Sequence, residues 1–292
     1  MEINALIAAF GGGVVGALLG GLPCFVFTGL ITIAGTIASL AGDASGFAGI
    51  AFGSFFGPHI AFCGGAAASA YAHRKGLIEN GQSLDSTFGT GAADTLIVGG
   101  VFGIVGYLIN FLFGTVLKFH TDTIALTVVC SGILARLIFG KTGLLGKFDS
   151  NDKRVVLTPG KGLIMNLVLG LGLGILVAFL PNALVAAGVS QDWINGNFQN
   201  LCFGVAAFSL IFASMGKASP GFHHIIAPAA GASVMLGPIY GIIFGIVGSL
   251  LGDVLGNLFN NGKCDSHIDP PGFAIFLQMW IINLLAGNGF AG

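Results

Sequence analysis

Two copies of a His-x-Asp pattern stand directly before long apolar runs, first at His120 and Asp122 and again at His267 and Asp269. An aspartate in front of a helix can accept a backbone N–H and cap that helix. Where the helix end lies inside a membrane, the same carboxylate can also face an ion or a polar solute. Capping at the membrane interface is the simpler interpretation, and binding is compatible with it. We therefore treat these four residues as candidates for substrate or ion binding.

Three further histidines lie inside segments that carry no other ionisable side chain. His59 occurs in GSFFGPHIAF, and His223 and His224 occur in ASPGFHHIIAP. Polar side chains at membrane depth are costly and usually face a cavity, a substrate or one another, although a histidine beside a kink can also be satisfied by packing. The flanking glycines and prolines break helices, and the freed backbone groups can bind ions or polar solutes. We expect a site lined by both broken segments.

Other side chains could assist such a site. Asp94 in GAADTLIVGG and Asp253 in GSLLGDVLGN could carry a coupling proton or cation, or could lie at the membrane surface. Arg136, about one turn from the end of its helix, is expected to extend to the inner membrane surface. Phenylalanines beside the histidine segments could form a dewetting gate or pack as ordinary apolar residues. They are Phe52, Phe55, Phe56 and Phe62 in the first segment and Phe208, Phe212 and Phe222 in the second.

The amino-acid composition indicates whether these residues lie in a soluble protein or in a lipid bilayer. Of the 292 residues, 54% are hydrophobic and 8% are charged, whereas a soluble domain carries about 25% charged residues. A bilayer core of about 30 Å needs about 20 apolar residues per helix. Several uncharged runs reach that length, and the run between residues 3 and 42 is long enough for two helices. The sequence therefore predicts an all-α, polytopic transmembrane helix bundle.

The apolar runs define the individual helices. We expect helices near residues 5–22, 24–41, 46–72, 93–117 and 123–140, and, after a polar loop, near 163–180, 182–190, 198–216, 221–236, 238–260 and 271–288. Proline removes a backbone donor and clashes with the preceding turn. Gly57-Pro58 and Leu180-Pro181 are therefore expected to interrupt spans. The prediction is about ten spans, some of them broken or re-entrant.

The two halves of the chain resemble each other. FGIVG occurs at residues 102–106 and again at 244–248, an offset of 142, and the His-x-Asp pattern recurs at an offset of 147. GPHIAFCGGAAAS from Gly57 matches GFHHIIAPAAGAS from Gly221. These matches predict a first transmembrane repeat at residues 1–140, a cytoplasmic linker at 141–161 and a second repeat at 162–292.

The number of helices in each repeat determines their relative orientation. Basic residues follow the third and fifth helices, which predicts that both of these loops are cytoplasmic. Five helices per repeat is an odd number, so the two copies are expected to be inverted, as in many transporters. Inversion would bring His59 and His223 towards one pseudo-twofold axis.

Several classes of function lack support. The net charge of −1 gives no reason to expect a nucleic-acid partner, and the five cysteines show no CxxC spacing. No Walker A or HExxH motif is present, so ATP-driven transport is not expected. The favoured interpretation is not an enzyme, and no cofactor is predicted. The expected partners are the lipid bilayer and a small-molecule or ion substrate. The identity of any bound metal is unknown, and both a monomer and a homo-oligomer are compatible with the sequence.

Two segments carry a resemblance to known proteins. GPHIAFCGGAAASAYAHRKG and, further along, TDTIALTVVCSGILARLIFGKTG resemble hydrophobic bacterial membrane proteins described as permeases of unknown function. The resemblance covers most of the chain. It implies transport but names neither a solute nor a site residue, and the motifs of ammonium, urea and formate channels are not evident.

The sequence thus favours a secondary transporter or channel for a small polar or ionic solute in a prokaryotic inner (plasma) membrane. Its site would lie near the bilayer midplane, at the interface of the repeats. Two alternatives stay open. One is an accessory or structural membrane subunit that needs a partner. The other is a membrane-embedded enzyme whose histidines and aspartates act as acid, base or metal ligands. Channel and carrier are not distinguished, and neither the substrate nor the coupling ion is identified.

Overall fold

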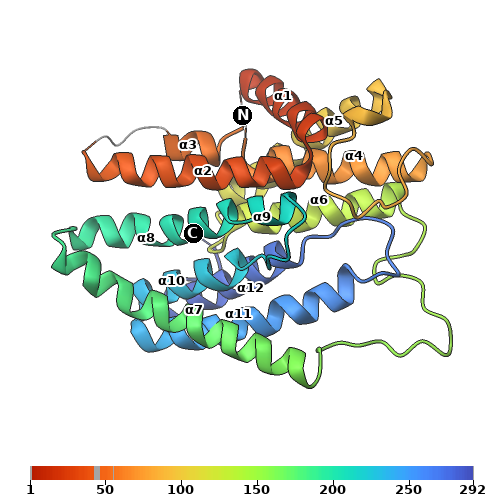
Figure 1. The fold of residues 1–292 in the computed structure, drawn as a ribbon. Coiled ribbons are helices and arrows are strands. Elements are labelled where there is room, and N and C mark those ends of the chain that lie inside the picture. The colour runs from red at the N-terminus through yellow and green to blue at the C-terminus, as the bar shows by residue number, and fades with distance from the viewer. Residues whose placement is uncertain (1, 43–46, 55, 292) are drawn as a thin grey trace.

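The protein is a bundle of helices (Figure 1). The structure, a computed structural model, describes residues 2–42, 47–54 and 56–291. Its α-helices are α1 (Ile3–Leu19), α2 (Gly21–Leu40), α3 (Phe47–Ala51), α4 (Cys63–Arg74), α5 (Ala93–Asn110), α6 (Thr123–Phe139), α7 (Lys161–Ala186), α8 (Gln191–Phe208), α9 (Ile211–Ser214), α10 (His223–Leu236), α11 (Pro238–Phe259) and α12 (Pro270–Leu285). Two π-helical segments, η1 (Pro58–Phe62) and η3 (Phe111–Val116), and a short 3-10 helix, η2 (Phe88–Thr90), adjoin them.

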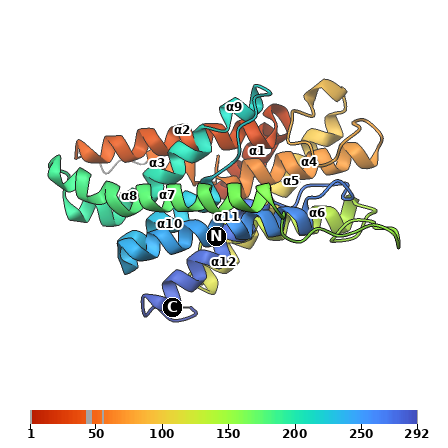
Figure 2. The ribbon, with the colours of Figure 1, turned by 60° about the horizontal axis from the view of Figure 1, so that its bottom comes forward.

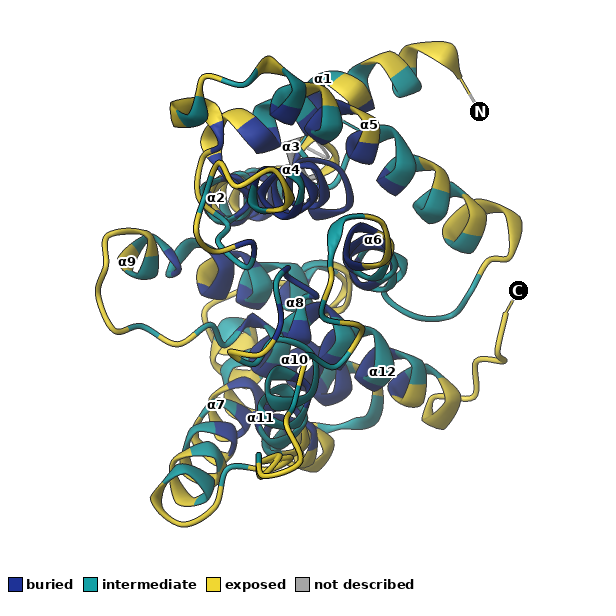
Figure 3. Cartoon of the chain, turned by 90° about the vertical axis from the view of Figure 1, so that its right-hand side faces the viewer, coloured by how far each residue is buried: buried dark blue, intermediate teal, exposed yellow. Residues whose placement is uncertain are grey.

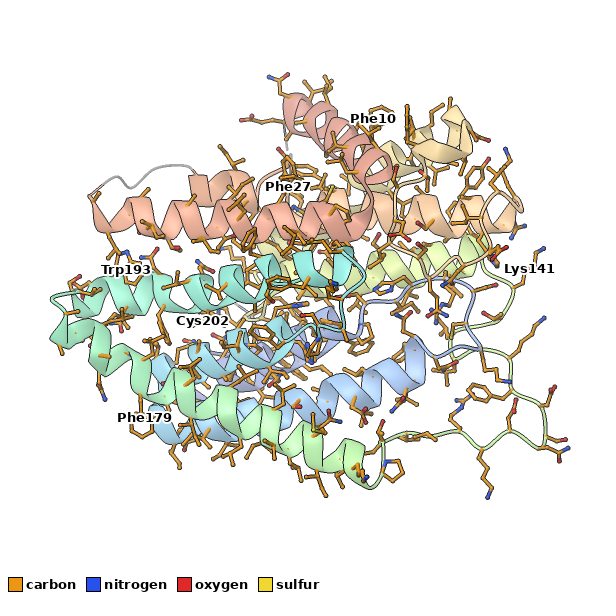
Figure 4. All side chains as sticks on the ribbon, in the orientation of Figure 1. Phe10, Phe27, Lys141, Phe179, Trp193 and Cys202 are labelled. Carbon is orange, nitrogen blue, oxygen red and sulfur yellow. The ribbon has the colours of Figure 1, made fainter. Side chains whose placement is uncertain are left out.

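The outer surface of the bundle is apolar. Among the described residues, five helical segments are long and apolar enough to cross a membrane, namely 21–40, 93–116, 161–186, 191–214 and 238–259. Large apolar side chains such as Phe27 of α2 and Phe179 of α7 are 45% and 61% exposed (Figure 4). So much exposed apolar surface is unfavourable in water and favourable in lipid. The chain is therefore an integral membrane protein.

Pro181 does not interrupt its span. Residues 161–186 form one continuous helix, α7, with Pro181 inside it. The expected break at Leu180-Pro181 and the separate helices at 163–180 and 182–190 are therefore wrong. A break at this position would expose unpaired backbone groups to lipid, which costs more than accommodating one proline.

The first histidine segment is broken, as expected. The predicted helix at 46–72 is divided into α3, which ends at Ala51, and a second part that begins at Pro58. Gly57 precedes this second part with φ −51° and ψ 147°, and Pro58 takes the first helical position, where its missing N–H costs nothing. The predicted helix at 198–216 is likewise divided between α8 and α9.

Glycines set the closest helix contacts. Gly13 of α1, Gly64 of α4 and Gly99 of α5 converge, so that a Cβ on Gly64 would lie 2.6 Å from the carbonyl oxygen of Gly13 and 2.8 Å from that of Gly99. Helix α7 lies along α11 (Figures 1 and 2) through a similar contact, where a Cβ on Gly170 would lie 2.6 Å from the carbonyl oxygen of Gly245. Small residues therefore let these backbones touch.

This packing predicts opposite effects for two substitutions in one helix. Gly13→Ala is expected to lower the free energy of unfolding by about 1–3 kcal/mol, because the new methyl group overlaps the backbone of Gly99. Gly11→Ala, on the same helix, meets nothing within 4 Å, and it should be neutral or stabilising, since alanine favours helix by about 1 kcal/mol. Thermal unfolding in detergent would compare the two variants. Equal stability would contradict this account of the contact.

Three loops gather at one end of the bundle. Gln82 donates hydrogen bonds to the carbonyl oxygens of Asn261 and Cys264, at 2.9 and 2.6 Å. Lys263 forms an ion pair with Asp152 at 3.0 Å, and its hydrogen bond lowers the pKa of that carboxyl group. The loops at 75–92, 140–160 and 260–269 therefore lie together, at the end marked by Lys141 in Figure 4.

A hydrogen bond between α2 and α8 lies at the opposite end of the bundle. The indole N–H of Trp193, near the start of α8, donates to the hydroxyl of Ser39, near the end of α2, at 2.7 Å. Figure 4 shows Trp193 far from Lys141. Helices α2 and α8 therefore pack antiparallel. Figure 3, which views the bundle from the Lys141 end, shows the buried residues on the facing sides of the central helices and the exposed residues at the periphery.

Candidate functional site

A cavity of about 520 Å³ lies among the central helices and is lined by residues from both halves of the chain. Its wall is mostly apolar, but polar side chains enter it from four places: the start of α6, the middle of α8, the start of α10 and the segment that leads into α12. These polar residues are Asp122, Gln199, Asn200, His223, Asn260, His267 and Asp269.

The two aspartates of the His-x-Asp patterns cap adjacent helices. Asp122 accepts a hydrogen bond from the backbone N–H of Ala125 at 2.8 Å, and Asp269 accepts one from Gly272 at 2.7 Å. Ala125 and Gly272, the two residues that donate to the aspartates, are themselves in contact, since a Cβ on Gly272 would lie 3.2 Å from the carbonyl oxygen of Ala125. Both helices therefore begin beside the cavity, with a carboxylate at each N-terminus. A helix N-terminus favours negative charge close to it.

Asp269 is also held by a histidine. The Nε2 of His267 lies 3.1 Å from Oδ1 of Asp269, and the Nδ1 of His267 lies 3.0 Å from the amide nitrogen of Asn260. These contacts fit a His267 ring whose Nδ1 accepts from the Asn260 amide and whose Nε2–H donates to Asp269. The chain from Asn260 through His267 to Asp269 fixes the orientation of the carboxylate at the cavity wall.

The intramembrane histidines occupy two kinds of position. His223 lines the cavity, whereas His59 and His224 are not among its lining residues in the described structure. The His59 ring packs beside Gly57, and the His224 ring packs against Gly252 of α11. The Nδ1 atoms of all three histidines are buried without a hydrogen-bond partner among the described residues.

Aromatic rings surround His223 and connect it with His267. The His223 ring centroid lies 4.8 Å from that of Phe25 and 6.3 Å from that of Phe203. Phe62 lies 5.9 Å from Phe25 and 5.7 Å from His267. Phe52 and Phe62 of the first expected phenylalanine cluster do line the cavity, whereas Phe55 lies outside the described residues. In place of the second cluster, Phe25 and Phe203 complete the wall.

Three candidates lie away from the cavity. His120 is half-buried, and its Nδ1 lies 2.9 Å from the carbonyl oxygen of Gly289. Asp94 forms a surface ion pair with Lys75 at 2.5 Å. Asp253 accepts hydrogen bonds from the backbone N–H and the hydroxyl of Thr158, both at 2.7 Å, and so fastens the linker to α11. The structure brings Asp122, Asp269, His223 and His267 together around one space and leaves these three outside it.

Arg136 does not reach the membrane surface, so that expectation was wrong. Its side chain is 2% exposed and donates to the carbonyl oxygens of Leu144 and Phe259, each at 2.6 Å. It also donates to the hydroxyl of Ser266 at 2.9 Å and to the carbonyl oxygen of the same residue. These acceptors lie at the C-terminal end of α11 and in two loops, and they retain the guanidinium inside the protein.

The amide side chains of the site were not predicted from the sequence. Gln199 and Asn200 lie in an uncharged apolar run, and Asn260 ends α11. An amide in such a run is a weaker signal than a charge, but it follows the same rule that polar groups at membrane depth face a cavity or one another. No three His, Cys, Asp or Glu side chains among the described residues form a metal-binding group. The enzyme alternative therefore has no metal-ligand set in the part of the chain that is described.

The fold and the cavity define an integral membrane protein of helical type with a mostly apolar cavity that contains several polar side chains. The chain belongs to the family described as "Family of unknown function (DUF7973)", which matches it over residues 1–160 and 168–291. No curated protein matches the chain, and no solved structure does. The family description names no activity, so the resemblance to permeases stays a prediction.

Proposed function

We propose that the protein is a secondary transporter or channel for a small polar or ionic solute, and that the central cavity is its solute site. The observation that carries the proposal is a cavity of about 520 Å³ with two carboxylates at capped helix ends in a mostly apolar bundle. Its volume falls within the range of about 300–1,000 Å³ for ligand pockets. Carboxylates at membrane depth are costly, and they usually mark the path of a substrate or ion.

Equivalent glycine contacts support two repeats in the chain. Gly13 of α1 packs on the carbonyl oxygen of Gly99 of α5, and Gly174 of α7 packs on that of Gly241 of α11. The offset between Gly99 and Gly241 is 142 residues, the same as between the two FGIVG segments. On this proposal each half contains five membrane segments, of which the third in the first half is the broken pair α3 and α4.

The contact between α6 and α12 supports an inverted arrangement. Ala125 and Gly272 touch, and their offset of 147 residues is the same as that of the His-x-Asp patterns. Contact between a residue and its own counterpart is what a twofold axis produces. Thr121 at the start of α6 donates to the carbonyl oxygen of Phe276 at 2.6 Å, so the two helices pack antiparallel, as inverted repeats require. The proposed axis therefore passes beside the cavity.

The same correspondence changes the pairing of the histidines. His59 packs through its carbonyl oxygen on Gly106, and His224 packs in the same way on Gly248. Gly106 and Gly248 are counterparts at the offset of 142. On this proposal the counterpart of His59 is therefore His224, whereas the sequence match had paired His59 with His223. Pro58 and His223 are then the equivalent residues that face the cavity.

The charge distribution supports one orientation in the membrane. Basic side chains gather in or beside the three loops that meet at one end of the bundle. They are Arg74, Lys75, Lys141, Lys147, Lys153, Arg154, Lys161 and Lys263. Basic residues in short loops mark the cytoplasmic side. On this proposal the end that carries the linker faces the cytoplasm of a prokaryotic cell, and the membrane is its inner membrane.

Covalent blocking of the cavity tests the proposal. Flux of a panel of cationic, neutral and anionic small solutes is measured in liposomes that contain Asn200→Cys in a Cys130→Ser background. Asn200 lines the cavity, and the other native thiols are buried. A thiol-specific methanethiosulfonate reagent is expected to reduce the flux of the transported solute at least about tenfold, because the attached group occupies the cavity.

The matched control lies on the same helix. Gln191→Cys in the same background places a thiol at the exposed start of α8, and its modification should leave flux unchanged. If modification at position 200 also leaves flux unchanged, the cavity is not the pathway. If liposomes with the unmodified protein move no solute in the panel, the proposed transport function itself is rejected.

A further inference from the structure

We propose that the solute is a small organic monocation, such as an alkyl or quaternary ammonium compound. This inference rests on the proposed function and concerns the same cavity. It depends on three properties of the wall: the net charge, the aromatic faces and the volume.

The charged groups at the wall leave an excess of negative charge. Asp122 and Asp269 line the cavity, and no lysine or arginine is among its lining residues in the described structure. Each helix N-terminus contributes about half of a positive charge. With both carboxylates ionised, their charges and those of the two helix ends sum to about −1. One positive charge on a ligand would neutralise it, whereas an anion would be repelled.

The two carboxylates differ in their partners, and Asp122 is the one without a side-chain donor among the described residues. Both oxygens of Asp269 accept hydrogen bonds, one from His267 and the other from Gly272. Asp122 accepts hydrogen bonds only from the backbone, at Ala125 and Ile124, and no side chain among the described residues donates to it. A cationic head group would therefore be held most directly by Asp122, with Asp269 as a fixed second charge.

The other wall groups favour an organic cation over an inorganic one. Phe25, Phe52, Phe62 and Phe203 present aromatic rings to the cavity, and such faces attract ammonium groups within about 6 Å. Calcium requires about six to eight oxygen ligands, and magnesium requires near-octahedral oxygen coordination. The described residues contain no group of three or more acidic, histidine or cysteine side chains placed to hold a metal. A cavity of about 520 Å³ also exceeds the space that a bare ion fills.

The test compares a cation with its uncharged isostere. Choline and 3,3-dimethylbutan-1-ol have the same shape, but carbon replaces the charged nitrogen in the second compound. Binding of each to the purified full chain in detergent is measured by calorimetry, with tetraethylammonium, butylammonium and acetate as further probes. We expect at least one ammonium probe to bind, choline to bind at least about tenfold more tightly than its isostere, and acetate not to bind.

Substitution of Asp122 connects the charge preference with the site. Asp122→Asn keeps the ability to cap α6 but removes the charge, so it is expected to weaken ammonium binding at least about tenfold. Asp94→Asn removes a carboxylate at the surface and should leave binding unchanged. Circular dichroism and size-exclusion chromatography establish that both variants are folded. An Asp122→Asn variant that binds ammonium like the wild type overturns the assignment.

Two other outcomes overturn the inference, and they can be separated from failure of transport itself. If choline and its isostere bind equally, or if only acetate binds, the solute is not selected as a cation. If liposomes then carry a neutral or anionic solute, and modification at position 200 blocks it, the cavity remains a transport site with another solute class. If no solute crosses, the proposed function fails together with this inference.

Discussion

Arg136→Met is expected to lower the free energy of unfolding by about 3 kcal/mol or more. The guanidinium donates to the backbone carbonyl oxygens of Leu144, Phe259 and Ser266, and a methionine of similar length satisfies none of them. Each buried polar group that loses its partner costs about 1–3 kcal/mol. The loss is expected in both thermal and denaturant unfolding of the purified protein.

Arg136→Lys is the matched variant for this prediction. Lysine keeps the positive charge but lacks the planar fork that reaches several acceptors at once, so its stability should lie between those of the wild type and the methionine variant. If methionine and arginine give the same stability, the hydrogen bonds of Arg136 do not hold the loops together.

Asp269→Asn and Asp269→Ala should separate the capping of α12 from the charge in the cavity. Both substitutions remove the carboxylate, so both are expected to reduce solute flux in liposomes about tenfold or more, since hydrogen bonds to charged groups are worth about 1.5–3 kcal/mol. Only Asp269→Ala should also lower stability, by about 0.5–2 kcal/mol, because asparagine still accepts the N–H of Gly272 and alanine does not.

Asp253→Asn serves as the control for these two variants. Its carboxylate binds Thr158 in the linker and lies outside the cavity, so flux should remain at the wild-type level. Flux that persists in Asp269→Asn would show that the charge of Asp269 is not used in transport, whatever the stability of the two variants.

The sequence predicted the helical membrane architecture because composition and uninterrupted apolar length are sufficient for that purpose. It was less reliable where one residue decides a boundary. Pro181 was read as a break, but it is accommodated within α7, whereas Pro58 begins a new helix after Gly57. Both prolines follow apolar residues in the sequence. The difference depends on whether the surrounding helices can supply partners to the freed backbone groups, and a single sequence does not contain that information.

The candidate residues were predicted by type more successfully than by position. Two aspartates before apolar runs could be recognised as caps, and Asp122 and Asp269 do cap α6 and α12. Their histidines diverge, since His267 contacts Asp269 while His120 contacts Gly289. The difference comes from the segments that pack beside each histidine, which are distant in the chain. Gln199 and Asn200 were missed for the same reason, because only the packed bundle shows which face of α8 borders the cavity.

The short length of α6 and α12 has an electrical consequence. The two helices contain 17 and 16 residues, which corresponds to about 25 Å at about 1.5 Å per residue and falls short of a hydrocarbon core of about 30 Å. If the loops that precede these helices lie below the headgroups, water can hydrate them there. The electrical potential of the bulk solution would then extend deeper into the membrane. A resting voltage is worth about 2.3 kcal/mol per charge for each 100 mV. The membrane potential would then fall across a thinner insulating layer, and its steepest gradient would lie close to Asp122 and Asp269.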